Sequence, residues 1–283
     1  MLAINGLNQG KRYQLKATVI ISIYEKFEYL ELVLAGFENQ SFKNFEIVIA
    51  DDGSKQETVT KIEKFASKFP VNIIHVWHED KGFRKNKILN RALEISNSDY
   101  LIFIDGDCIP HKHFVKEHFV NKDYGTTLTG RRVNLSSGFT SRLTPQKIRD
   151  GYLENHFLQL SLDGIFGNTS YVEKGIYLKS GLLRRIANKK NRGLLGCNFS
   201  IHKKDFLDIN GFDERYEAPS IGEDSDVQFR LELNNVKIKS LNNIAIQYHL
   251  YHKLLPRPGK NLDLFEKVKK EKKAFTEFGI VKK

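Results

Sequence analysis

The sequence contains no apolar run that approaches the roughly 20 residues a helix needs to cross a bilayer. The stretch from Met1 to Lys16 also lacks an apolar segment long enough to serve as a secretory signal. Together these two absences predict a cytoplasmic protein.

Cysteine and proline are also scarce. The two cysteines, Cys108 and Cys197, have no spacing typical of metal ligands, and a cytosolic compartment would keep them reduced. We therefore interpret both as packing residues. With 6 prolines, 40% hydrophobic residues and 28% charged residues in 283 positions, the chain is typical of one large globular domain with or without a C-terminal extension.

Acidic residues are outnumbered by basic ones, 34 against 45, which gives a formal net charge of +11. This charge favours an anionic partner, and nucleic acid, acidic lipid and nucleotide sugar all qualify. No stripe of interleaved aromatic and basic residues occurs, so we expect no nucleic acid partner. Basic residues gather at 184–185, 189–192 and 267–273, which leaves open a solvated basic surface or contact with an anionic membrane.

Short apolar runs alternate with helical patterns over the first hundred residues. Runs rich in β-branched residues predict strands, and apolar residues at helical spacing predict helices between them. The expected strands are 18–24, 45–50, 71–77 and 100–104, and the expected helices are 27–39, 57–69 and 84–96. This alternation predicts an α/β protein with a mostly parallel, Rossmann-like central sheet flanked by helices.

The rest of the chain has weaker signals. Residues 124–193 are rich in Gly, Ser, Asn and basic residues, which indicates a variable insertion or a mobile loop region. A helix at 227–234 and a strand at 237–246 are expected next, and a basic amphipathic tail at 262–278 closes the chain.

Polar or acidic residues follow three of the expected strands. They are Tyr24-Glu25, Asp51-Asp52 and Asp105-Gly106-Asp107. Because ligands bind beyond the carboxyl ends of strands in open parallel sheets, these side chains should converge on one edge. Asp also favours turns, so one such group alone would be structural, but three together favour a ligand site.

The pattern Asp105-x-Asp107 has a specific chemistry. Its hard carboxylate oxygens suit Mn²⁺ or Mg²⁺, although a turn after a strand gives the same pattern. A second acidic pair, Glu223-Asp224, precedes the helix expected at 227–234. That is the placement of a general base, and the helix dipole favours it equally, so spacing alone does not separate the two interpretations.

An ordered set of motifs resembles glycosyltransferase family 2, whose members have the GT-A fold. The amino-terminal motifs are Val19 to Tyr24, Asn44 to Ser54 (NFEIVIADDGS), Gly82-Phe83-Arg84 and Asp105-Gly106-Asp107-Cys108. The later motifs, Gly196-Cys197-Asn198, Asn210 to Glu214 and Gly222-Glu223-Asp224, resemble the galactosyltransferase-type region of chondroitin polymerases and β-1,4-galactosyltransferases. The resemblance covers residues 18–252. It implies a nucleotide-sugar-binding half at 1–123, an acceptor-binding and catalytic half at 124–260, and a tail at 261–283.

The resemblance implies donor contacts at the strand ends. Asp51 or Asp52 would hydrogen-bond the uracil or ribose of a UDP-sugar, and Tyr24 would lie against the base. Asp105 would reach the ribose or the metal through water, with Gly106 beside it. Glu25, Arg84 and Lys87 complete the implied donor set: Arg84 and Lys87 would face the diphosphate, although Lys87 is equally well explained as a helix-surface residue.

Metal and acceptor roles are implied further along the chain. Asp107 would bind Mn²⁺ or Mg²⁺ directly, and His249 would be the late metal ligand, with His252 as the competing candidate. Asp224 would be the catalytic base, and Glu223 would contact the acceptor sugar.

Some positions depart from the family pattern. The first strand ends Ser22-Ile23-Tyr24-Glu25 where relatives usually have Pro-Thr-Tyr-Asn, and Leu89 stands where an Arg is common. Pro219-Ser220-Ile221 replaces the usual aromatic-glycine pair. We therefore do not transfer a galactosyl specificity from the relatives.

The implied reaction is an inverting, metal-dependent transfer of a hexosyl or N-acetylhexosaminyl group from a nucleotide-diphosphate sugar, expected to be a UDP-sugar. The acceptor would be a hydroxyl of a glycan or lipid-linked glycan in surface polysaccharide or lipooligosaccharide synthesis. The basic tail would attach such a cytoplasmic enzyme to the anionic inner face of the cell membrane.

Two alternatives to this function remain. A phosphatase could use Asp-x-Asp as its nucleophile, but Cys108-Ile109 follows the motif here where Thr or Val would be expected. A non-catalytic basic module for nucleic acid or lipid would explain the net charge, but it leaves the carboxylates without a role.

Overall fold

The computed structural model describes residues 16–219, 223–253 and 259–282. The expectation for the first residues of the chain lies outside these ranges, as does the departure at Ser220 and Ile221. Among the described helices, none is long and apolar enough to cross a membrane.

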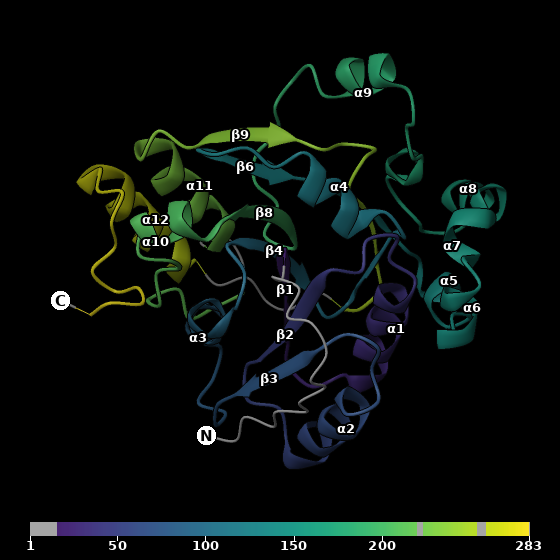
Figure 1. Cartoon of the computed structure of the whole chain (residues 1–283), viewed down its shortest axis with the longest axis horizontal. Helices are drawn as coiled ribbons and strands as arrows, with labels where there is room; N and C mark the ends of the chain where they lie inside the picture. The colour runs from purple at the N-terminus through teal and green to yellow at the C-terminus, as the bar shows by residue number, and fades with distance from the viewer. Residues whose placement is uncertain (1–15, 220–222, 254–258, 283) are drawn as a thin grey trace.

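Seven strands form the central sheet, in the order β3-β2-β1-β4-β8-β6-β9 (Figure 1). Strands β1 to β4 pair in parallel, whereas β8 runs antiparallel to both of its neighbours, so the expected mostly parallel sheet is confirmed. The strands are β1 Ala17–Ile23, β2 Phe45–Asp51, β3 Ile73–Trp77, β4 Tyr100–Asp105, β6 Thr126–Thr129, β8 Asn198–His202 and β9 Lys237–Ser240. The helices between the first strands are α1 Phe27–Glu38, α2 Gln56–Ala66 and α3 Lys85–Ile95, and α4 Phe114–Val120 follows them.

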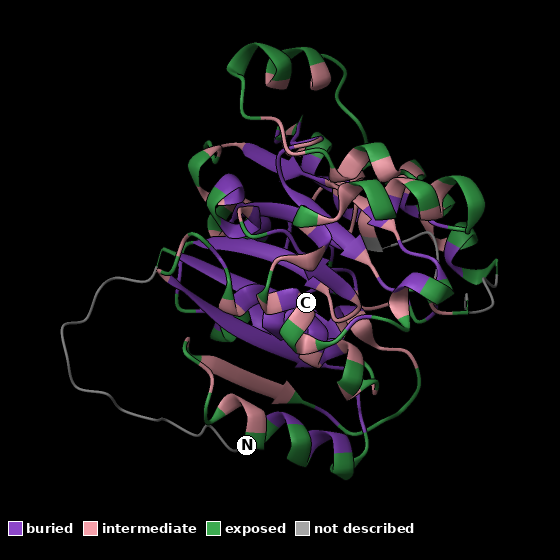
Figure 2. Ribbon diagram, turned by 90° about the vertical axis from the view of Figure 1, so that its right-hand side faces the viewer, coloured by how far each residue is buried: buried purple, intermediate pink, exposed green. Residues whose placement is uncertain are grey.

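The centre of the sheet forms because its strands are apolar runs that are covered on both faces. Every residue of β1 and β2 is buried. Val19 packs in one core with Leu30 of α1, while Ile20 packs in a second core with Ile88 of α3. Since successive side chains point to opposite faces of a strand, α1 and α3 cover opposite faces of the sheet. Figure 2 shows the buried strands between helices whose outer residues are exposed.

A second sheet of three strands lies in the order β5-β10-β7, with β5 Cys108–Pro110, β7 Arg131–Asn134 and β10 Ile246–His249. The single strand expected at 237–246 is therefore wrong in its extent, because β9 and β10 belong to different sheets. Asn243 adopts a left-handed conformation with φ of 59° between them. Asn tolerates that conformation, and the resulting turn sends the chain out of the central sheet.

Residues 137–193, which we call the helical excursion, fold into a series of short helices. They are α5 Ser137–Thr140, α6 Pro145–Arg149, α7 Tyr152–Asn155, α8 Phe157–Phe166, the 3₁₀ helix η1 Val172–Gly175 and α9 Gly181–Ala187. Asn134 and Ser170 exchange two backbone hydrogen bonds of 2.9 and 3.0 Å, which tie the excursion to the small sheet. In Figure 1, α5 to α8 lie along the right-hand side and α9 stands away from the body at the top.

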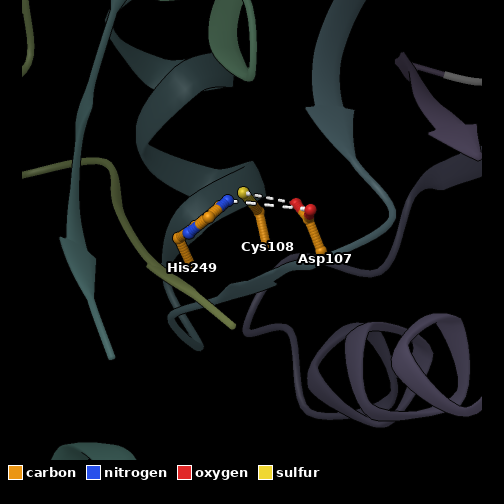
Figure 3. Close-up of side chains that lie close together, drawn as sticks. All are labelled: Asp107, Cys108 and His249. Atoms are coloured by element: carbon orange, nitrogen blue, oxygen red, sulfur yellow. Dashed lines mark hydrogen bonds and ion pairs between the residues drawn. The ribbon is translucent and has the colours of Figure 1, made fainter. Parts of the chain in front are cut away.

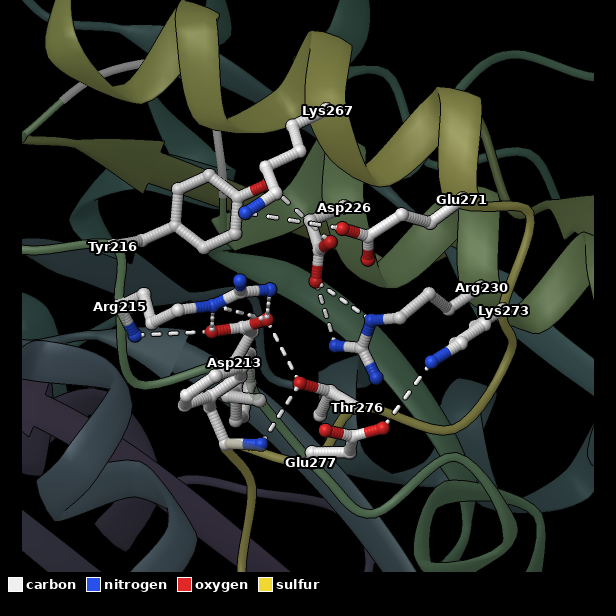
Figure 4. Close-up of polar contacts among 12 residues, drawn as sticks. Asp213, Arg215, Tyr216, Asp226, Arg230, Lys267, Glu271, Lys273, Thr276 and Glu277 are labelled. Atoms are coloured by element: carbon white, nitrogen blue, oxygen red, sulfur yellow. Dashed lines mark hydrogen bonds and ion pairs between the residues drawn. The ribbon is translucent and has the colours of Figure 1, made fainter.

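The C-terminal segment packs on the domain. Three helices precede or form it: α10 Lys203–Asp208, α11 Glu223–Leu233 and α12 Lys260–Glu271. Val268 of α12 is 5% exposed, and Phe265 meets Phe229 of α11 edge-on with ring centroids 6.2 Å apart. Beyond α12, the Thr276 hydroxyl donates a 2.8 Å hydrogen bond to Asp213 (Figure 4). The apolar face expected of the tail is therefore turned toward α11, and the basic residues remain outside.

Candidate functional site

Strand ends of the central sheet meet at one edge. Ser22 of β1 pairs with Asp105 of β4, and Ile23 of β1 pairs with Asp51 of β2. Beyond these ends lies a cavity of about 780 Å³. Its walls come from within segments 22–29, 50–52, 80–85, 105–107, 217–219 and 252–253. Residues far apart in the sequence therefore meet around a hollow large enough for a small organic ligand.

The turn after β4 is held by backbone contacts. The Gly106 N–H donates a 2.7 Å hydrogen bond to the Ser22 carbonyl, and the Ser22 hydroxyl donates one of 2.6 Å to Asp105 Oδ1. A Cβ on Gly106 would lie 3.0 Å from that carbonyl oxygen, so the turn leaves little room for a side chain. The Asp107 carbonyl accepts a 2.8 Å bond from Leu250 N–H. The turn is thereby fixed between β1 and the residues after β10.

Asp107 faces two histidines. Its Oδ2 atom lies 3.1 Å from Nε2 of His252 and 3.6 Å from Nε2 of His249. Burial alone would raise the pKa of Asp107, but the hydrogen bond from His252 and the charges of both histidines outweigh it and lower the pKa to about 2. Asp107 is therefore a carboxylate throughout the physiological pH range.

The two histidines have different surroundings. His249 lies on β10, and burial lowers its pKa in spite of Asp107, which favours the neutral imidazole that binds metals. His252 follows the strand, lines the cavity, and has its pKa raised by the hydrogen bond with Asp107. A carboxylate and two imidazoles are a ligand set that suits a divalent cation such as Mn²⁺. The geometry brings both histidines to Asp107 and leaves the choice between them open.

Cys108 and Cys197 do more than fill space. The Cys108 thiol donates a 3.4 Å hydrogen bond to Asp107 Oδ1, and burial raises its pKa. Ligand atoms of Asp107, Cys108 and His249 lie within 4.8 Å of one another (Figure 3). Cys197 Sγ accepts hydrogen bonds from Arg132 and Gln247, at 3.3 and 3.0 Å. Because the Cys108 thiol stays protonated, we interpret it as a donor that orients Asp107.

Asp51 is fully buried, and both of its oxygens have partners. Oδ1 accepts a 2.8 Å bond from Ser54 N–H, and Oδ2 lies 3.1 Å from Nε2 of His75. It is not among the described residues that line the cavity. Through these contacts, Asp51 stabilises the turn after β2 and links that turn to β3.

Asp52 does line the cavity. Its Oδ1 lies 2.7 Å from Nε2 of His78, and its Oδ2 accepts a 2.9 Å bond from Arg84 N–H. Each carboxylate oxygen has a second lone pair, so Asp52 can still accept a hydrogen bond from a ligand. Of the two aspartates, Asp52 is placed for donor contact.

The basic residues after β3 lie differently from the sequence expectation. The Arg84 guanidinium donates to the backbone carbonyl of Glu79. Neither Arg84 nor Lys87 is among the described residues that line the cavity, whereas Lys85 is. Its Nζ lies 2.9 Å from Asp105 Oδ1, which places a positive charge beside the Asp105 turn.

Tyr24 and Glu25 both line the cavity but have different partners. Tyr24 is 54% exposed and donates a 3.1 Å hydrogen bond to Asp80. The Glu25 carboxylate accepts bonds of 2.9 Å from Lys55 N–H and 2.7 Å from the Thr58 hydroxyl. Glu25 therefore caps the start of α2, while the Tyr24 ring remains available to a flat ligand.

Helix α11 begins at Glu223, so the acidic pair does lie at a helix start. Asp224 Oδ1 accepts a 2.8 Å bond from Ser225 N–H, and Oδ2 lies 3.5 Å from the nitrogen of Gly196. Gly196 lines a small cavity together with Asp105. Asp224 thus lies beside Gly196, and it is not among the described residues that line the 780 Å³ cavity. The Glu223 side chain lies outside the described part of the chain.

Several residues of this site were missed by sequence reasoning. They are Ser22, His75, His78, Asp80 and Lys85. Position in the sequence could have indicated two of them: His78 and Asp80 lie just after the end of the third strand, as the selected carboxylates do after other strands. His75 lies within that strand, and only the pairing of β3 with β2 brings it to Asp51. The histidine partners of Asp51 and Asp52 come from β3 and the residues after it, next to β2 in the sheet.

Comparison with known families decides the class of protein. Residues 18–181 match the family described as glycosyl transferase family 2, more than half of the chain. The chain belongs to glycosyl transferase family 2. Residues 187–253 match a second family, described as the N-terminal domain of galactosyltransferase. The expected recognition is confirmed in both halves, and the Asp-x-Asp phosphatase is excluded.

The curated relatives of this family 2 chain include polysaccharide synthases. Chondroitin synthase of Pasteurella multocida (strain Pm70) is 25% identical over 226 residues, which cover 76% of this chain and 22% of the synthase. Chondroitin synthase of Escherichia coli is 24% identical over 238 residues, covering 82% of this chain and 34% of the synthase. The chain thus spans about a fifth to a third of the length of these relatives.

Solved structures confirm the GT-A fold of the family 2 chain. GalNAc-T7 with UDP, GalNAc and Mn²⁺ matches with a TM-score of 0.56 at 13% identity, over 86% of this chain and 45% of that one. TarS of S. aureus with UDP-GlcNAc matches with a TM-score of 0.53 at 20% identity, over 85% of this chain and 60% of TarS. The mannosyltransferase PcManGT from Pyrobaculum calidifontis, with GDP-Man and Mn²⁺, matches with a TM-score of 0.53 at 15% identity, over 86% of this chain and 59% of PcManGT.

Proposed function

We propose that this chain is an inverting, metal-dependent glycosyltransferase that moves a hexosyl or N-acetylhexosaminyl group from a UDP-sugar to a hydroxyl of a glycan or lipid-linked glycan. The observation that carries the proposal is Asp107 between His249 and His252, at the wall of the 780 Å³ cavity where the strands end. An ionised carboxylate beside imidazoles, next to a cavity of this size, suits a metal-bound diphosphate.

The donor half of the cavity would be built by 1–123. The Tyr24 ring would lie against the base, Asp52 would accept a hydrogen bond from it, and Lys85 would balance the diphosphate charge. Structures of the same fold contain UDP-GlcNAc in one case and GDP-Man in another, which supports a nucleotide-sugar donor and leaves the sugar to be measured.

The metal would be Mn²⁺ or Mg²⁺, held by Asp107 with His249 and His252. When bound, it supplies positive charge to the diphosphate that leaves the sugar. The chain's own residues prepare this site: Cys108 and the Leu250 N–H fix Asp107, and Lys85 adds a cation at Asp105. Solved structures of the same fold contain Mn²⁺, which supports this cofactor.

The acceptor half would be 124–260. Asp224 would take the proton from the attacking hydroxyl, because it lies at a helix start and its carboxylate is 3.5 Å from Gly196, which lines a small cavity together with Asp105. Glu223 would position the acceptor sugar. Since the relatives include chondroitin synthases, we place the reaction in surface polysaccharide or lipooligosaccharide synthesis at the cytoplasmic side of the membrane.

A donor screen tests this function. The purified chain, with Mn²⁺ present, is incubated with UDP-, GDP- and CMP-sugars in turn, and thermal stability and release of the free nucleotide are measured. We expect a UDP-sugar to raise the melting temperature and to be slowly hydrolysed. If no nucleotide sugar stabilises the protein or is cleaved, the proposal is wrong and a non-catalytic basic module becomes the better interpretation.

A further inference from the structure

Helix α8 carries an apolar stripe that the described chain leaves uncovered. Leu158, Leu162 and Ile165 are 73%, 47% and 71% exposed, and Phe166 at the end of the helix is 84% exposed. Positions i, i+4 and i+7 share one face of a helix. Leu160, on the opposite face, is 1% exposed and packs in the core. The helix therefore has one apolar face in the core and another in solvent.

Helix α9 repeats this feature in a stronger form. None of its residues is buried, and Leu182, Leu183 and Ile186 are 60%, 49% and 62% exposed. Figure 1 shows α9 away from the body of the molecule, and Figure 2 shows it with outward residues exposed. A cluster of large apolar side chains in solvent is unusual for a soluble surface and indicates an interaction site.

The charge around these helices has one sign. Residues 157–193 contain seven basic residues and two acidic ones, so nearly half of the formal net charge of +11 lies in about an eighth of the chain. Of the acidic residues, Asp163 is paired with Arg142 and bonded by the Thr169 hydroxyl. The exposed basic residues are Lys179, Arg185, Lys189, Lys190 and Arg192.

We propose that α8 and α9 form a docking surface for an anionic lipid bilayer, with their apolar residues in the headgroup boundary and the neighbouring lysines and arginines against lipid phosphates. Apolar residues and positive charge on one segment match the two properties of such a bilayer surface, an apolar interior and a negative exterior. A protein partner would need a surface of matching shape that is both acidic and apolar. Any anionic bilayer has negative headgroups above an apolar interior, so it needs no such matching shape.

The chain that leads into the docking surface contacts the candidate site. Just before the excursion, the Leu135 N–H donates a 2.9 Å hydrogen bond to the His249 carbonyl. The Thr140 hydroxyl oxygen accepts a 2.9 Å bond from the Tyr251 N–H, between the two histidines of the metal group. Attachment at α8 and α9 would therefore hold the site close to a membrane in which a lipid-linked acceptor is anchored. Lipid binding itself requires neither the donor nor catalysis.

This surface replaces the C-terminal tail as the membrane contact. The tail turns Val268 and Phe265 toward the domain, and its exposed large apolar residues, Leu262, Phe278 and Val281, do not share one helix. In the excursion, exposed apolar residues gather on α8 and α9 beside exposed basic residues. The tail therefore serves as a control for the excursion.

Vesicle flotation tests the proposal with the intact chain. The vesicles are phosphatidylcholine alone, or an equimolar mixture of phosphatidylcholine and phosphatidylglycerol. We expect flotation with the mixture at low salt and little with phosphatidylcholine. The double variant Ile165→Ser/Phe166→Ser should weaken binding about tenfold or more, since it removes apolar surface from the boundary. Lys189→Glu/Lys190→Glu should weaken it by a similar factor and reduce its salt dependence.

Matched variants in the tail complete the experiment. Leu262→Ser/Val281→Ser and Lys270→Glu/Lys272→Glu make the same changes at exposed positions of the C-terminal segment, and we expect both to bind like the wild type. Equal loss in tail and excursion variants would overturn the proposal, as would absence of flotation in the wild type. If Ile165→Ser/Phe166→Ser instead converts a dimer into a monomer in light scattering, the surface joins two copies and the proposal is wrong. Unchanged transfer to a soluble acceptor in all variants keeps these outcomes separate from those for the proposed function.

Discussion

At the scale of single residues, the three carboxylates of the proposed chemistry have different neighbours. Asp107 lies between two histidines, and Asp105 contacts Lys85 and the Ser22 hydroxyl. Within the described part of the chain, the contacts of Asp224 are two backbone N–H groups and the Ser225 hydroxyl. A carboxylate held by cations is a poor base, so this contrast favours Asp224 for proton removal and Asp107 for charge binding.

Asp224→Asn tests the base directly. The amide keeps the shape of the side chain and loses its basicity, so transfer should fall by about two to four orders of magnitude while the Kd for the donor barely changes. Transfer is measured at saturating acceptor, and the Kd by calorimetry. Retention of more than about a tenth of wild-type transfer would remove Asp224 from this role.

Two companion variants give different signatures. Asp107→Asn should weaken metal-dependent donor binding as well as kcat, because it removes an ionised ligand. Glu223→Gln should chiefly raise KM for the acceptor if Glu223 positions that sugar. The three variants together distinguish a base, a metal ligand and an acceptor contact, and they must fold equally well by circular dichroism for the comparison to hold.

His118 makes stability depend on pH. It is fully buried between the Ser200 hydroxyl and Asn198 Oδ1, and burial lowers its pKa to about 4. A depressed pKa means that the unfolded state binds the extra proton between about pH 6.5 and 4, so stability is complete above that range and falls with falling pH. The loss by pH 4 should be on the order of 3 kcal/mol.

Urea unfolding across this pH range measures the effect. His118→Gln should be less stable at neutral pH, because the packing and hydrogen bonds are altered, yet its stability should fall less steeply below about pH 6.5. An unchanged slope in the variant would show that other groups account for the acid sensitivity. His111, whose pKa burial lowers to about 3, should contribute a similar and separate slope.

At the scale of elements, α11 is held by a buried ion pair. Arg230 and Asp226, both 1% exposed, lie 2.6 Å apart at i and i+4 (Figure 4). Arg230 also donates to the carbonyls of Ile209 and Gly211. Arg230→Met should cost about 3–5 kcal/mol of unfolding free energy, because Asp226 and two carbonyls lose their partner. Denaturant unfolding measures this cost.

A matched pair provides the control for that measurement. Lys204 and Asp208 are also four residues apart and 2.6 Å from each other, but Lys204 is 81% exposed. Lys204→Met should produce no measurable change, because water replaces the lost partner. If Arg230→Met were equally harmless, the buried pair would not hold α11 in place. The double variant Asp226→Asn/Arg230→Met should recover part of the loss, since it leaves no unpaired charge.

Elements that bury a regular apolar pattern could be predicted from the sequence, and elements that do not could not. Strands β1, β2 and β4 are almost fully buried, so each is a continuous apolar run that the sequence shows directly. The edge strand β3 is only partly buried, but it is still an apolar run of β-branched and aromatic residues. The excursion could not be assigned because its helices are short and α9 buries nothing, which leaves no periodic core face to detect. The division of 237–246 into β9 and β10 depends on a turn at Asn243 that apolar periodicity does not register.

At the scale of the whole molecule, the site combines segments that only the fold brings together. Asp52, Asp105 and Asp107 could be predicted because parallel strand ends must share an edge. The approach of His249 and His252 depends on β10 pairing with β5, and nothing local in the sequence states that pairing. The sequence does not show that Lys85, and not Lys87, faces the cavity, because that depends on how α3 is rotated about its axis.

Removal of the metal from the intact protein tests whether Asp107 and the two histidines form a metal site. Since Asp107 is ionised and two histidines converge on it, we expect the chain to bind Mn²⁺ without a donor, measurable by electron paramagnetic resonance. Excess chelator should abolish transfer and weaken UDP-sugar binding, and added Mn²⁺ or Mg²⁺ should restore both. Full transfer in chelator would contradict the metal assignment.

Single-histidine variants then identify the ligand that the geometry leaves open. His249→Ala and His252→Ala should each be assayed for Mn²⁺ affinity and for transfer, with His156→Ala, a partly exposed histidine of the excursion, as the control. Loss of a true ligand should weaken Mn²⁺ binding at least tenfold, whereas loss of a neighbour that only balances the charge of Asp107 should change it little. Equal losses in both variants would mean that the cation uses both imidazoles, which the distances of 3.6 and 3.1 Å to Asp107 allow. Unchanged Mn²⁺ affinity in both would leave Asp107 as a carboxylate without a metal and would remove the observation on which the proposed function rests.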